Sequence, residues 1–216
     1  MKVILINGSP RQNGNTMKLL NKAAEGAISV GAETEIVPLY KLNYKGCSSC
    51  FACKRKNSPF VGHCAMRDDL SPVLEKVITS DVLILGSPIY LGDITSEMRS
   101  FLERFVFMNL SYDKDKITNF KGNLSVGFIY SMGIPQERIK TSGYSNIFDL
   151  HQSYFQLFNG KSEYLISSDA YQFDDYSKYD ASRYDEQHKA EVRAAQFPVD
   201  CKHAFEMGAR LASNKI

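Results

Sequence analysis

The sequence predicts a three-layer α/β fold, in which a doubly wound parallel sheet of five strands in the order 2-1-3-4-5 lies between helices. Three observations lead to this expectation. Short apolar segments alternate with longer segments of helical periodicity. Two of the apolar segments are followed directly by glycine-containing loops. No internal repeat or low-complexity linker divides the 216 residues, so we expect a single domain over residues 1–216.

The first half of the chain begins with the apolar run 3–7, which is typical of a strand buried on both faces. A loop over 8–15 follows, after which apolar residues recur at helical spacing until Gly31. Residues 33–39 predict the second strand. Residues 40–68 are expected to form an irregular loop that contains cysteines.

The second half continues the alternation of helices and strands. Ser71 and Pro72 are typical of a helix start, with proline at the first helical position. The apolar strand that follows should stop at Gly86, because Gly, Ser and Pro come there in succession. The expected elements are a helix from residue 71, a strand over 82–85, a helix from residue 94, a strand over 123–130, a helix over 144–158 and a strand over 162–166.

The C-terminal segment, residues 168–216, differs in composition from the rest of the chain. It is rich in aromatic and acidic residues up to Asp185. We expect a polar helix over 185–196, a break at Pro198 and a last amphipathic helix. The aromatic residues either attach this tail to its own domain, which we favour, or cover a site on a neighbouring subunit.

Composition and charge exclude several classes of function. Hydrophobic residues make up 44% and charged residues 23% of the chain, which is ordinary for a globular protein. The net charge is +2 and the basic residues are scattered, so neither nucleic acid nor an anionic membrane is an expected partner. The N-terminal apolar run is too short for a signal peptide, and no stretch has the length of a membrane span. We therefore expect a cytoplasmic protein.

Four of the five cysteines lie close together in the sequence: Cys47, Cys50, Cys53 and Cys64. An odd count without a secretion signal argues against a disulfide framework. Four thiols are the number that a [4Fe–4S] cluster needs, and two-residue gaps let a loop wrap three thiolates around it. A structural zinc site and free thiols are the alternatives. Cys201 is expected to be a small core residue.

The loop Gly8-Ser-Pro-Arg-Gln-Asn-Gly-Asn-Thr16 joins the first strand to the first helix. Backbone amides in such a loop and the helix N-terminus direct partial positive charge at one point, which predicts an anion site. Ser9, Asn15 and Thr16 can add hydrogen bonds, and Arg11 can add a full charge. No lysine follows the second glycine and no G-x-G-x-x-G occurs, which excludes nucleoside triphosphate and dinucleotide loops. A phosphomonoester fits this loop best.

A second loop, Gly-Ser-Pro-Ile-Tyr-Leu-Gly-Asp-Ile at residues 86–94, follows the third strand. In the order 2-1-3-4-5 the first and third strands adjoin where the strand order reverses, and ligands bind outside their carboxyl ends. Both loops should therefore meet at one crevice. A flat aromatic ring is expected against Pro88, Ile89 and Tyr90, with the backbone amides of Leu91 and Gly92 near its polar edge.

The two loops together resemble the NADPH-dependent FMN reductase and iron–sulfur flavoprotein superfamily, which has a flavodoxin-like fold. The resemblance rests on Gly-Ser-Pro-Arg-x-x-Gly-Asn-Thr at 8–16 and Gly-Ser-Pro-Ile-Tyr at 86–90. The cysteine segment and Asp68-Asp69 lie between them in the expected order. In the tail, the segments 173–176 and 197–200 are similar to a subgroup of the superfamily.

The resemblance implies a non-covalently bound FMN and assigns residues to it. The phosphate contacts it implies are Ser9, Arg11, Asn15 and Thr16, and the isoalloxazine contacts are Pro88, Ile89, Tyr90, Leu91, Gly92 and Asp93. Ser131 and Gly133, after the fourth strand, form a third group of candidate FMN contacts.

The implied activity is that of an FMN-dependent oxidoreductase that passes electrons from NAD(P)H to a quinone, a flavin or a redox protein. The alternative is an electron-transfer protein that holds a [4Fe–4S] cluster on Cys47, Cys50, Cys53 and Cys64. A third interpretation is a domain without flavin that serves only in assembly. A homodimer or homotetramer is implied as well. No acid, base or nucleophile is assigned, because the chemistry belongs to the cofactor.

Overall fold

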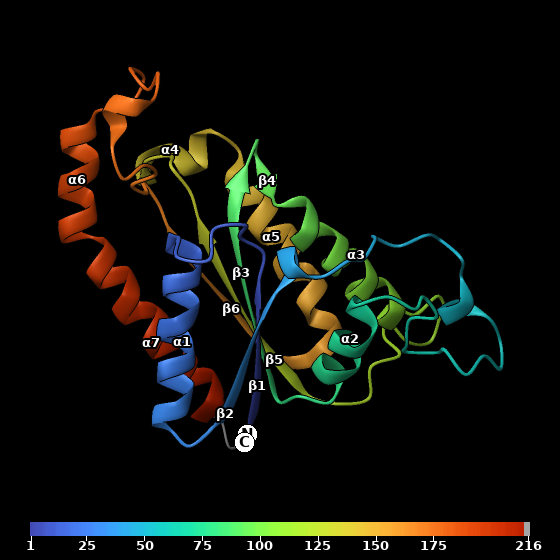
Figure 1. The fold of residues 1–216 in the computed structure, drawn as a ribbon. Helices are drawn as coiled ribbons and strands as arrows, with labels where there is room; N and C mark the ends of the chain where they lie inside the picture. Colours follow the sequence, from blue (N-terminus) through green and yellow to red (C-terminus); the bar gives the residue numbers. More distant parts are fainter. Residues whose placement is uncertain (214–216) are drawn as a thin grey trace.

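The central sheet consists of five parallel strands in the order β2-β1-β3-β5-β6, and the short strand β4 pairs antiparallel with the end of β3. The structure is a computed structural model that describes residues 1–213 (Figure 1). Because β4 lies off the main path, the sheet has the predicted order 2-1-3-4-5. The strands are β1 (Lys2–Asn7), β2 (Glu33–Pro38), β3 (Val82–Tyr90), β4 (Asp93–Ile94), β5 (Leu124–Ser131) and β6 (Asn159–Ser167).

Helices cover both faces of the sheet and complete the predicted three layers (Figure 1). One face is covered by α1 and α7, and the other by α2, α3 and α5. The short α4 and the helix α6, which leads into α7, lie toward the carboxyl end of the sheet (Figure 1). The helices are α1 (Asn15–Ser29), α2 (Leu70–Ile78), α3 (Ser96–Asn109), α4 (Gln136–Thr141), α5 (Tyr144–Phe155), α6 (Glu186–Ala195) and α7 (Phe197–Ser213).

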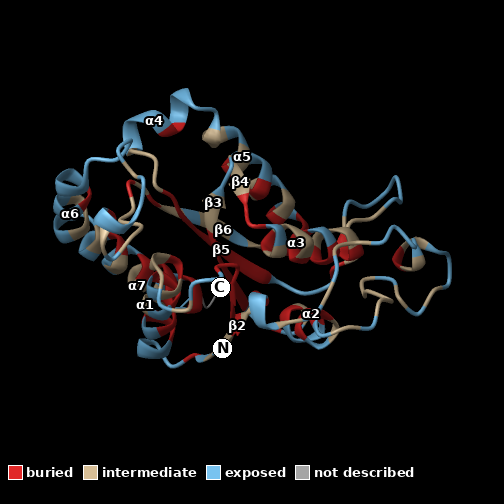
Figure 2. Ribbon diagram, turned by 45° about the horizontal axis from the view of Figure 1, so that its top comes forward, coloured by how far each residue is buried: buried red, intermediate tan, exposed pale blue. Residues whose placement is uncertain are grey.

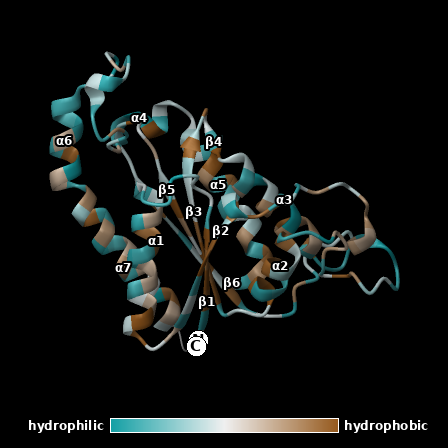
Figure 3. Cartoon of the chain, in the orientation of Figure 1, coloured by the Kyte–Doolittle hydropathy of each residue, from teal (hydrophilic) through white to brown (hydrophobic). Residues whose placement is uncertain are grey.

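Strand β1 shows why the central strands are uniformly apolar. Ile4 and Ile6 belong to the core under α2, α3 and α5, whereas Val3 and Leu5 belong to the core under α1 and α7. All four side chains are fully buried. A strand covered on both faces has no side that is open to water, so it needs apolar residues at every position. Figures 2 and 3 show the resulting buried, hydrophobic centre and the more polar outer surfaces of the helices.

Helices α1 and α7 approach each other closely at two glycines. A Cβ atom on Gly26 would lie 1.9 Å from the carbonyl oxygen of Phe205, and one on Gly208 would lie 1.9 Å from the carbonyl oxygen of Ala23. No side chain larger than hydrogen fits at either position. The two helices therefore contact each other backbone to backbone, and α7 holds α1 against the sheet.

Several element boundaries differ from the sequence predictions. Strand β3 does not stop at Gly86 but continues through Tyr90, because its end pairs with β5 at Pro88 and folds back onto β4 at Ile89. Helix α4 was not predicted, since six residues give too little periodicity to detect. Helix α5 ends at Phe155, and a 3-10 turn continues to Phe158.

Two prolines lie inside helices rather than at their first residues. Helix α2 begins at Leu70, so Pro72 is its third residue and not its first. Helix α7 begins at Phe197, directly before Pro198. Both prolines are within the first turn, where a backbone N–H has no partner inside the helix. The break between α6 and α7 falls at Gln196, close to the predicted place.

Within residues 1–213, no helix combines the length and the apolar character needed to cross a lipid bilayer.

The contact between α1 and α7 predicts that Gly208→Ala destabilises the protein. Alanine normally stabilises a helix interior by about 0.5–1 kcal/mol relative to glycine. Here its Cβ would meet the backbone of Ala23. We expect the free energy of unfolding, measured by urea denaturation, to fall by about 3 kcal/mol because of overpacking.

Gly31→Ala is the matched control. Gly31 has φ +85° and no atom within 4 Å of the added Cβ, so only backbone strain of about 1 kcal/mol is expected. A Gly208→Ala variant that is as stable as the wild-type protein would contradict the close packing of α1 on α7.

Candidate functional site

A cavity of about 800 Å³ lies at the carboxyl ends of β1, β3 and β5, the place predicted for a ligand in this strand order. This volume is within the range usual for small-molecule and cofactor sites. Nine of the twelve residues predicted for the flavin site line the cavity. They are Ser9, Arg11, Asn15, Thr16, Pro88, Ile89, Tyr90, Ser131 and Gly133.

The loop after β1 is held in shape by its own short hydrogen bonds. The buried Asn7 side chain accepts from the backbone N–H of Ser9 at 2.9 Å. The Ser9 hydroxyl accepts from the N–H of Arg11 at 3.2 Å, and the N–H of Gly14 donates to the carbonyl of Arg11 at 3.1 Å. The loop turns twice within seven residues and leads to the start of α1.

The N-terminus of α1 opens into the cavity without a side-chain cap. Gly14 stands at the cap position, where it offers no side-chain acceptor, and the first turn contains no acidic residue. Arg11, Lys18 and Arg193 add positive charge to the cavity lining, and Asp174 is the acidic residue there. Uncapped helix amides with nearby cations form an anion site. Thr16 shares a hydrogen bond of 2.7 Å with Ser131, which ties this site to β5.

A hairpin turn carries the second predicted loop. Leu91 and Gly92 both have positive φ angles, +50° and +95°, as a two-residue type I′ turn requires. Tyr90 pairs with Asp93 across the turn. Leu91, Gly92 and Asp93 do not line the cavity, and the Leu91 side chain is fully exposed. The Asp93 carboxylate accepts from the N–H of Ile94 at 2.7 Å. These three residues therefore lie outside the cavity, next in the chain to Tyr90, which lines it.

The tail after β6 contacts the loop over residues 8–16, and it was missing from the site predicted from the sequence. The Arg11 guanidinium donates to the carbonyl of Gln172 at 2.7 Å. The Asn15 side chain donates to the carbonyl of Tyr171 at 3.1 Å and accepts from Arg193 at 2.6 Å. The tail thus packs on its own domain, by contacts between segments more than 150 residues apart in the chain.

Aromatic side chains of the tail form one side of the cavity. Phe173 stacks on Tyr179, with ring centroids 4.1 Å apart, and both line the cavity. Tyr176 is buried between Tyr171 and Phe173, and its hydroxyl accepts from the N–H of Gln172 at 3.2 Å. The sequence signal for this wall was the series of aromatic residues in an otherwise acidic segment.

A buried charge pair fastens the tail and α6 to the loop after β5. The Lys189 ammonium group donates to the Asp169 carboxylate and, at 2.7 Å, to the carbonyl of Gly133. His188 lies 2.6 Å from the other carboxylate oxygen. Burial opposes the charge on Asp169, but the hydrogen bonds from Lys189 and His188 outweigh it and lower its pKa. The wall of the cavity therefore depends on an ionised Asp169.

The predicted cysteine ligands line a second, small cavity that shares no residue with the first. Cys47, Cys50, Cys53 and Cys64 surround about 20 Å³, which is room for about one water. All four thiols are free. Within the part of the chain that the structure describes, no group of three or more His, Cys, Asp or Glu side chains is arranged to hold a metal ion. Cys201 lies apart from them, at the edge of the core under α1 and α7.

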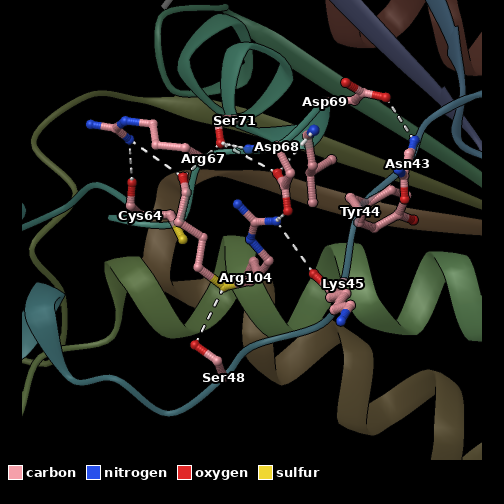
Figure 4. A network of polar contacts seen from close by, with 12 residues as sticks. Asn43, Tyr44, Lys45, Ser48, Cys64, Arg67, Asp68, Asp69, Ser71 and Arg104 are labelled. Carbon is pink, nitrogen blue, oxygen red and sulfur yellow. Dashed lines mark hydrogen bonds and ion pairs between the residues drawn. The ribbon is translucent and has the colours of Figure 1, made fainter.

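Arg104 of α3 lies against this second cavity and is fully buried. One of its terminal nitrogens, Nη1, donates to Asp68 at 2.5 Å and to the carbonyl of Lys45 at 3.3 Å. Its Nε and Nη2 atoms have no hydrogen-bond partner. Figure 4 shows the guanidinium between Asp68 and the sulfur of Cys64. A charged residue at this position was not predicted as part of the cysteine site.

The Asp169 network predicts a pH-dependent loss of stability in Asp169→Asn. Removing one partner of a buried ion pair leaves the other uncompensated, so we expect a loss of about 3 kcal/mol at pH 7. The contribution of the carboxylate is present above its unfolded pKa of about 3.9 and is lost as the pH falls through the lower folded value. Urea denaturation of both proteins should therefore show a difference that is complete at pH 7 and shrinks below about pH 4.

Asp175→Asn is the control for this prediction, because Asp175 lies in the same tail but forms an exposed pair with Lys178. Its stability should match that of the wild-type protein. An equal loss in both variants would show that the buried contact with Lys189 is not the cause.

The comparisons with known proteins agree with this architecture. An iron-sulfur flavoprotein of Methanocaldococcus jannaschii is 36% identical over 104 residues, which is 48% of this chain and 51% of the relative. An iron-sulfur flavoprotein of Archaeoglobus fulgidus is 34% identical over 148 residues, 68% of this chain and 61% of the relative. The chain thus matches about half to three fifths of the length of these relatives.

Two solved structures show the same fold at low sequence identity. An NAD(P)H:quinone oxidoreductase from Methanothermobacter marburgensis superposes with a TM-score of 0.71 at 15% identity, over 100% of this chain and 99% of the other. An FMN-dependent NADH-azoreductase from Bacillus anthracis, in complex with FMN, gives 0.67 at 12% identity, over 98% and 99%.

The profile of one protein family covers most of the sequence, from β1 to the loop after β5. The match extends over residues 1–136, more than half of the 216 residues, and includes both predicted loops and the cysteine segment. The chain belongs to the NADPH-dependent FMN reductase family.

Proposed function

We propose that this protein is an FMN-dependent oxidoreductase that passes electrons from NAD(P)H to a small-molecule or redox-protein acceptor, such as a quinone or a flavin. The observation that carries the proposal is the cavity of about 800 Å³, whose lining combines the start of α1 and basic side chains with aromatic and apolar side chains. A flavin mononucleotide has the same two parts, a phosphate and a flat ring. The family match supports this cofactor.

The residues of the cavity divide into two groups under this proposal. Ser9, Asn15, Thr16 and the amides of α1 would hold the phosphate, and Arg11 would compensate its charge. Pro88, Ile89 and Tyr90 would lie against the ring, with the hairpin residues Leu91, Gly92 and Asp93 at its edge. Ser131 and Gly133 would contact the ring from β5.

FMN, when bound, supplies the hydride and electron chemistry, and the protein supplies position and shielding. Tyr171, Phe173 and Tyr179 line the cavity and would limit the access of water to the ring. The stacked pair of Phe173 and Tyr179 presents an apolar surface that suits a flat nicotinamide or quinone.

A homodimer or homotetramer is part of the proposal. The hairpin tip beside the cavity exposes Tyr90 and Leu91, which are large apolar side chains on the rim of the site. A second subunit that covered this tip would bury them and complete the cavity.

Arg11→Ala tests the FMN assignment. A hydrogen bond to a charged group contributes about 1.5–3 kcal/mol, so we expect the dissociation constant for FMN to rise roughly 10- to 100-fold in a fluorescence titration. Riboflavin has no phosphate, and its affinity should not change. Anaerobic addition of NADPH or NADH should bleach the bound flavin, and a quinone should restore its absorbance.

Arg138→Ala, on the exposed face of α4, is the control with an equal loss of charge. It should leave both affinities unchanged. Equal weakening of FMN and riboflavin by Arg11→Ala would contradict the phosphate role. A flavin that binds but is not reduced by either nucleotide would contradict the oxidoreductase reaction and favour an electron-transfer protein with another donor.

A second function, electron transfer through a [4Fe–4S] cluster, is favoured by the cysteine site. Four thiols from one loop line one cavity, and a buried guanidinium beside them has two nitrogens without hydrogen-bond partners. Cysteine thiolates in this number are the usual ligands of a cubane, and an anionic cluster would suit the unpaired donors. The donor chemistry therefore suits a cubane, although within the described residues the thiols are not arranged to hold a metal ion.

The second cavity is too small for the proposed cluster. About 20 Å³ does not hold a cubane, so the loop over residues 47–64 must move outward when the cluster assembles. Cys50 and Phe51 are exposed, so this part of the loop is open to solvent. The cluster would order the loop as it binds, as metals do in other small sites.

Cys50→Ser tests the cluster separately from the flavin. Protein purified without oxygen should contain about four irons per chain, and Cys50→Ser should lose most of them while FMN affinity is unchanged. Cys201→Ser is the control, because Cys201 is on α7, away from the cysteine cavity, and this variant should retain its iron. Iron that is absent from the wild-type protein, or unaffected by Cys50→Ser, would contradict the proposed ligands.

A further inference from the structure

The guanidinium of Arg104 is a buried charge, and its neighbours satisfy only part of its hydrogen-bonding capacity. Its side chain has no exposed surface, and it sits on α3. Asp68 and the carbonyl of Lys45 both accept from the same nitrogen, Nη1. Nε and Nη2 are buried and unpaired. Buried N–H groups without a partner are rare in folded proteins, and each one costs free energy.

The unpaired nitrogens lie beside sulfur. Arg104 lines the same cavity as the four clustered cysteines (Figure 4). Burial lowers the pKa of the guanidinium, but the hydrogen bond to Asp68 and the adjacent Cys64 thiol raise it overall. A thiol is a weak acceptor, whereas the thiolates and sulfides of an iron–sulfur cluster are anionic acceptors.

We propose that Arg104 donates Nε–H and Nη2–H to sulfur atoms of a [4Fe–4S] cluster held by Cys47, Cys50, Cys53 and Cys64, and thereby raises its reduction potential. This inference rests on the cluster proposed above. Reduction adds one negative charge to the cluster. A fixed buried cation with two donors stabilises the reduced state more than the oxidised state, because Coulomb interactions are strong away from water.

Asp68 gives Arg104 its orientation. The Asp68 carboxylate accepts from Nη1, and it is fixed at the start of α2 by the N–H of Leu70 at 3.2 Å and the hydroxyl of Ser71 at 3.3 Å. This arrangement holds one side of the guanidinium and leaves the other side toward the cysteines. Asp68 is therefore a positioning residue with a charge opposite to that of Arg104.

The experiment measures the cluster potential by an EPR-monitored redox titration of the full chain purified without oxygen. Arg104→Met removes the charge and both donors, and we expect the equilibrium constant for reduction to fall at least tenfold, which is about 59 mV for one electron. Arg104→Lys keeps the charge but loses the planar fork, and it should give a smaller shift in the same direction. Arg104→Lys also provides the measurement if Arg104→Met does not fold.

Two further variants separate direct donation from a structural role. Asp68→Asn breaks the ion pair but removes a negative charge, so it should leave the potential unchanged or raise it. A role limited to holding the loop against α2 would lower the potential in Asp68→Asn as well. Arg99→Met, an exposed arginine of α3 paired with Glu103, is the control for charge on the same helix and should have no effect.

The outcomes distinguish this inference from the function on which it rests. Wild-type protein without iron would overturn the cluster and the role of Arg104 together. Iron retained in Arg104→Met and Arg104→Lys, with the potential of the wild-type protein, would overturn only the role of Arg104. A fall in potential of equal size in Asp68→Asn would show that the pair acts by holding the loop.

Discussion

Helices α1 and α7 lie side by side on one face of the sheet, and the contacts of Gly26 and Gly208 with the neighbouring backbones fix α1 against α7. The N-terminus of α1 is therefore fixed at the carboxyl end of β1, where the N–H of Gly8 also donates to the carbonyl of Gly86 at 2.8 Å. Asn15, the first residue of α1, contacts both the tail and α6, so this helix end also sets where they lie. The packing of α1 on α7 thus helps to place the helix N-terminus at the cavity.

The fold was predictable because its strands are buried on both faces. Four consecutive apolar residues, Val3 to Ile6, followed by a Gly/Pro loop, are typical of a strand buried on both faces. The position of the loop over residues 8–16 was predictable for a related reason, since a loop between such a strand and a helix lies at the carboxyl end of the sheet. The end of β3 was not, because Pro88 and Gly86 are locally unfavourable to a strand and only the pairing with β4 and β5 overrides them.

The missing parts of the site come from contacts over long sequence separations. Arg193 bonds to Asn15 across 178 residues, and nothing in the sequence near either residue indicates this. Arg104 was missed for another reason. A single arginine on an amphipathic helix is expected to face water, whereas this one faces inward to Asp68. The spacing of the cysteines indicated the group of thiols. The position of the Arg104 guanidinium beside them could be found only from the three-dimensional structure.

The tail also has a consequence for the time course of ligand exchange. Its backbone carbonyls occupy donors on Arg11 and Asn15, and α6 is fastened by Lys189. A molecule bound in the cavity would lie against this segment along one side, so local unfolding of the segment would remove that side and speed its escape. The rate of exchange would then depend on the stability of the tail as well as on the contacts of the molecule itself.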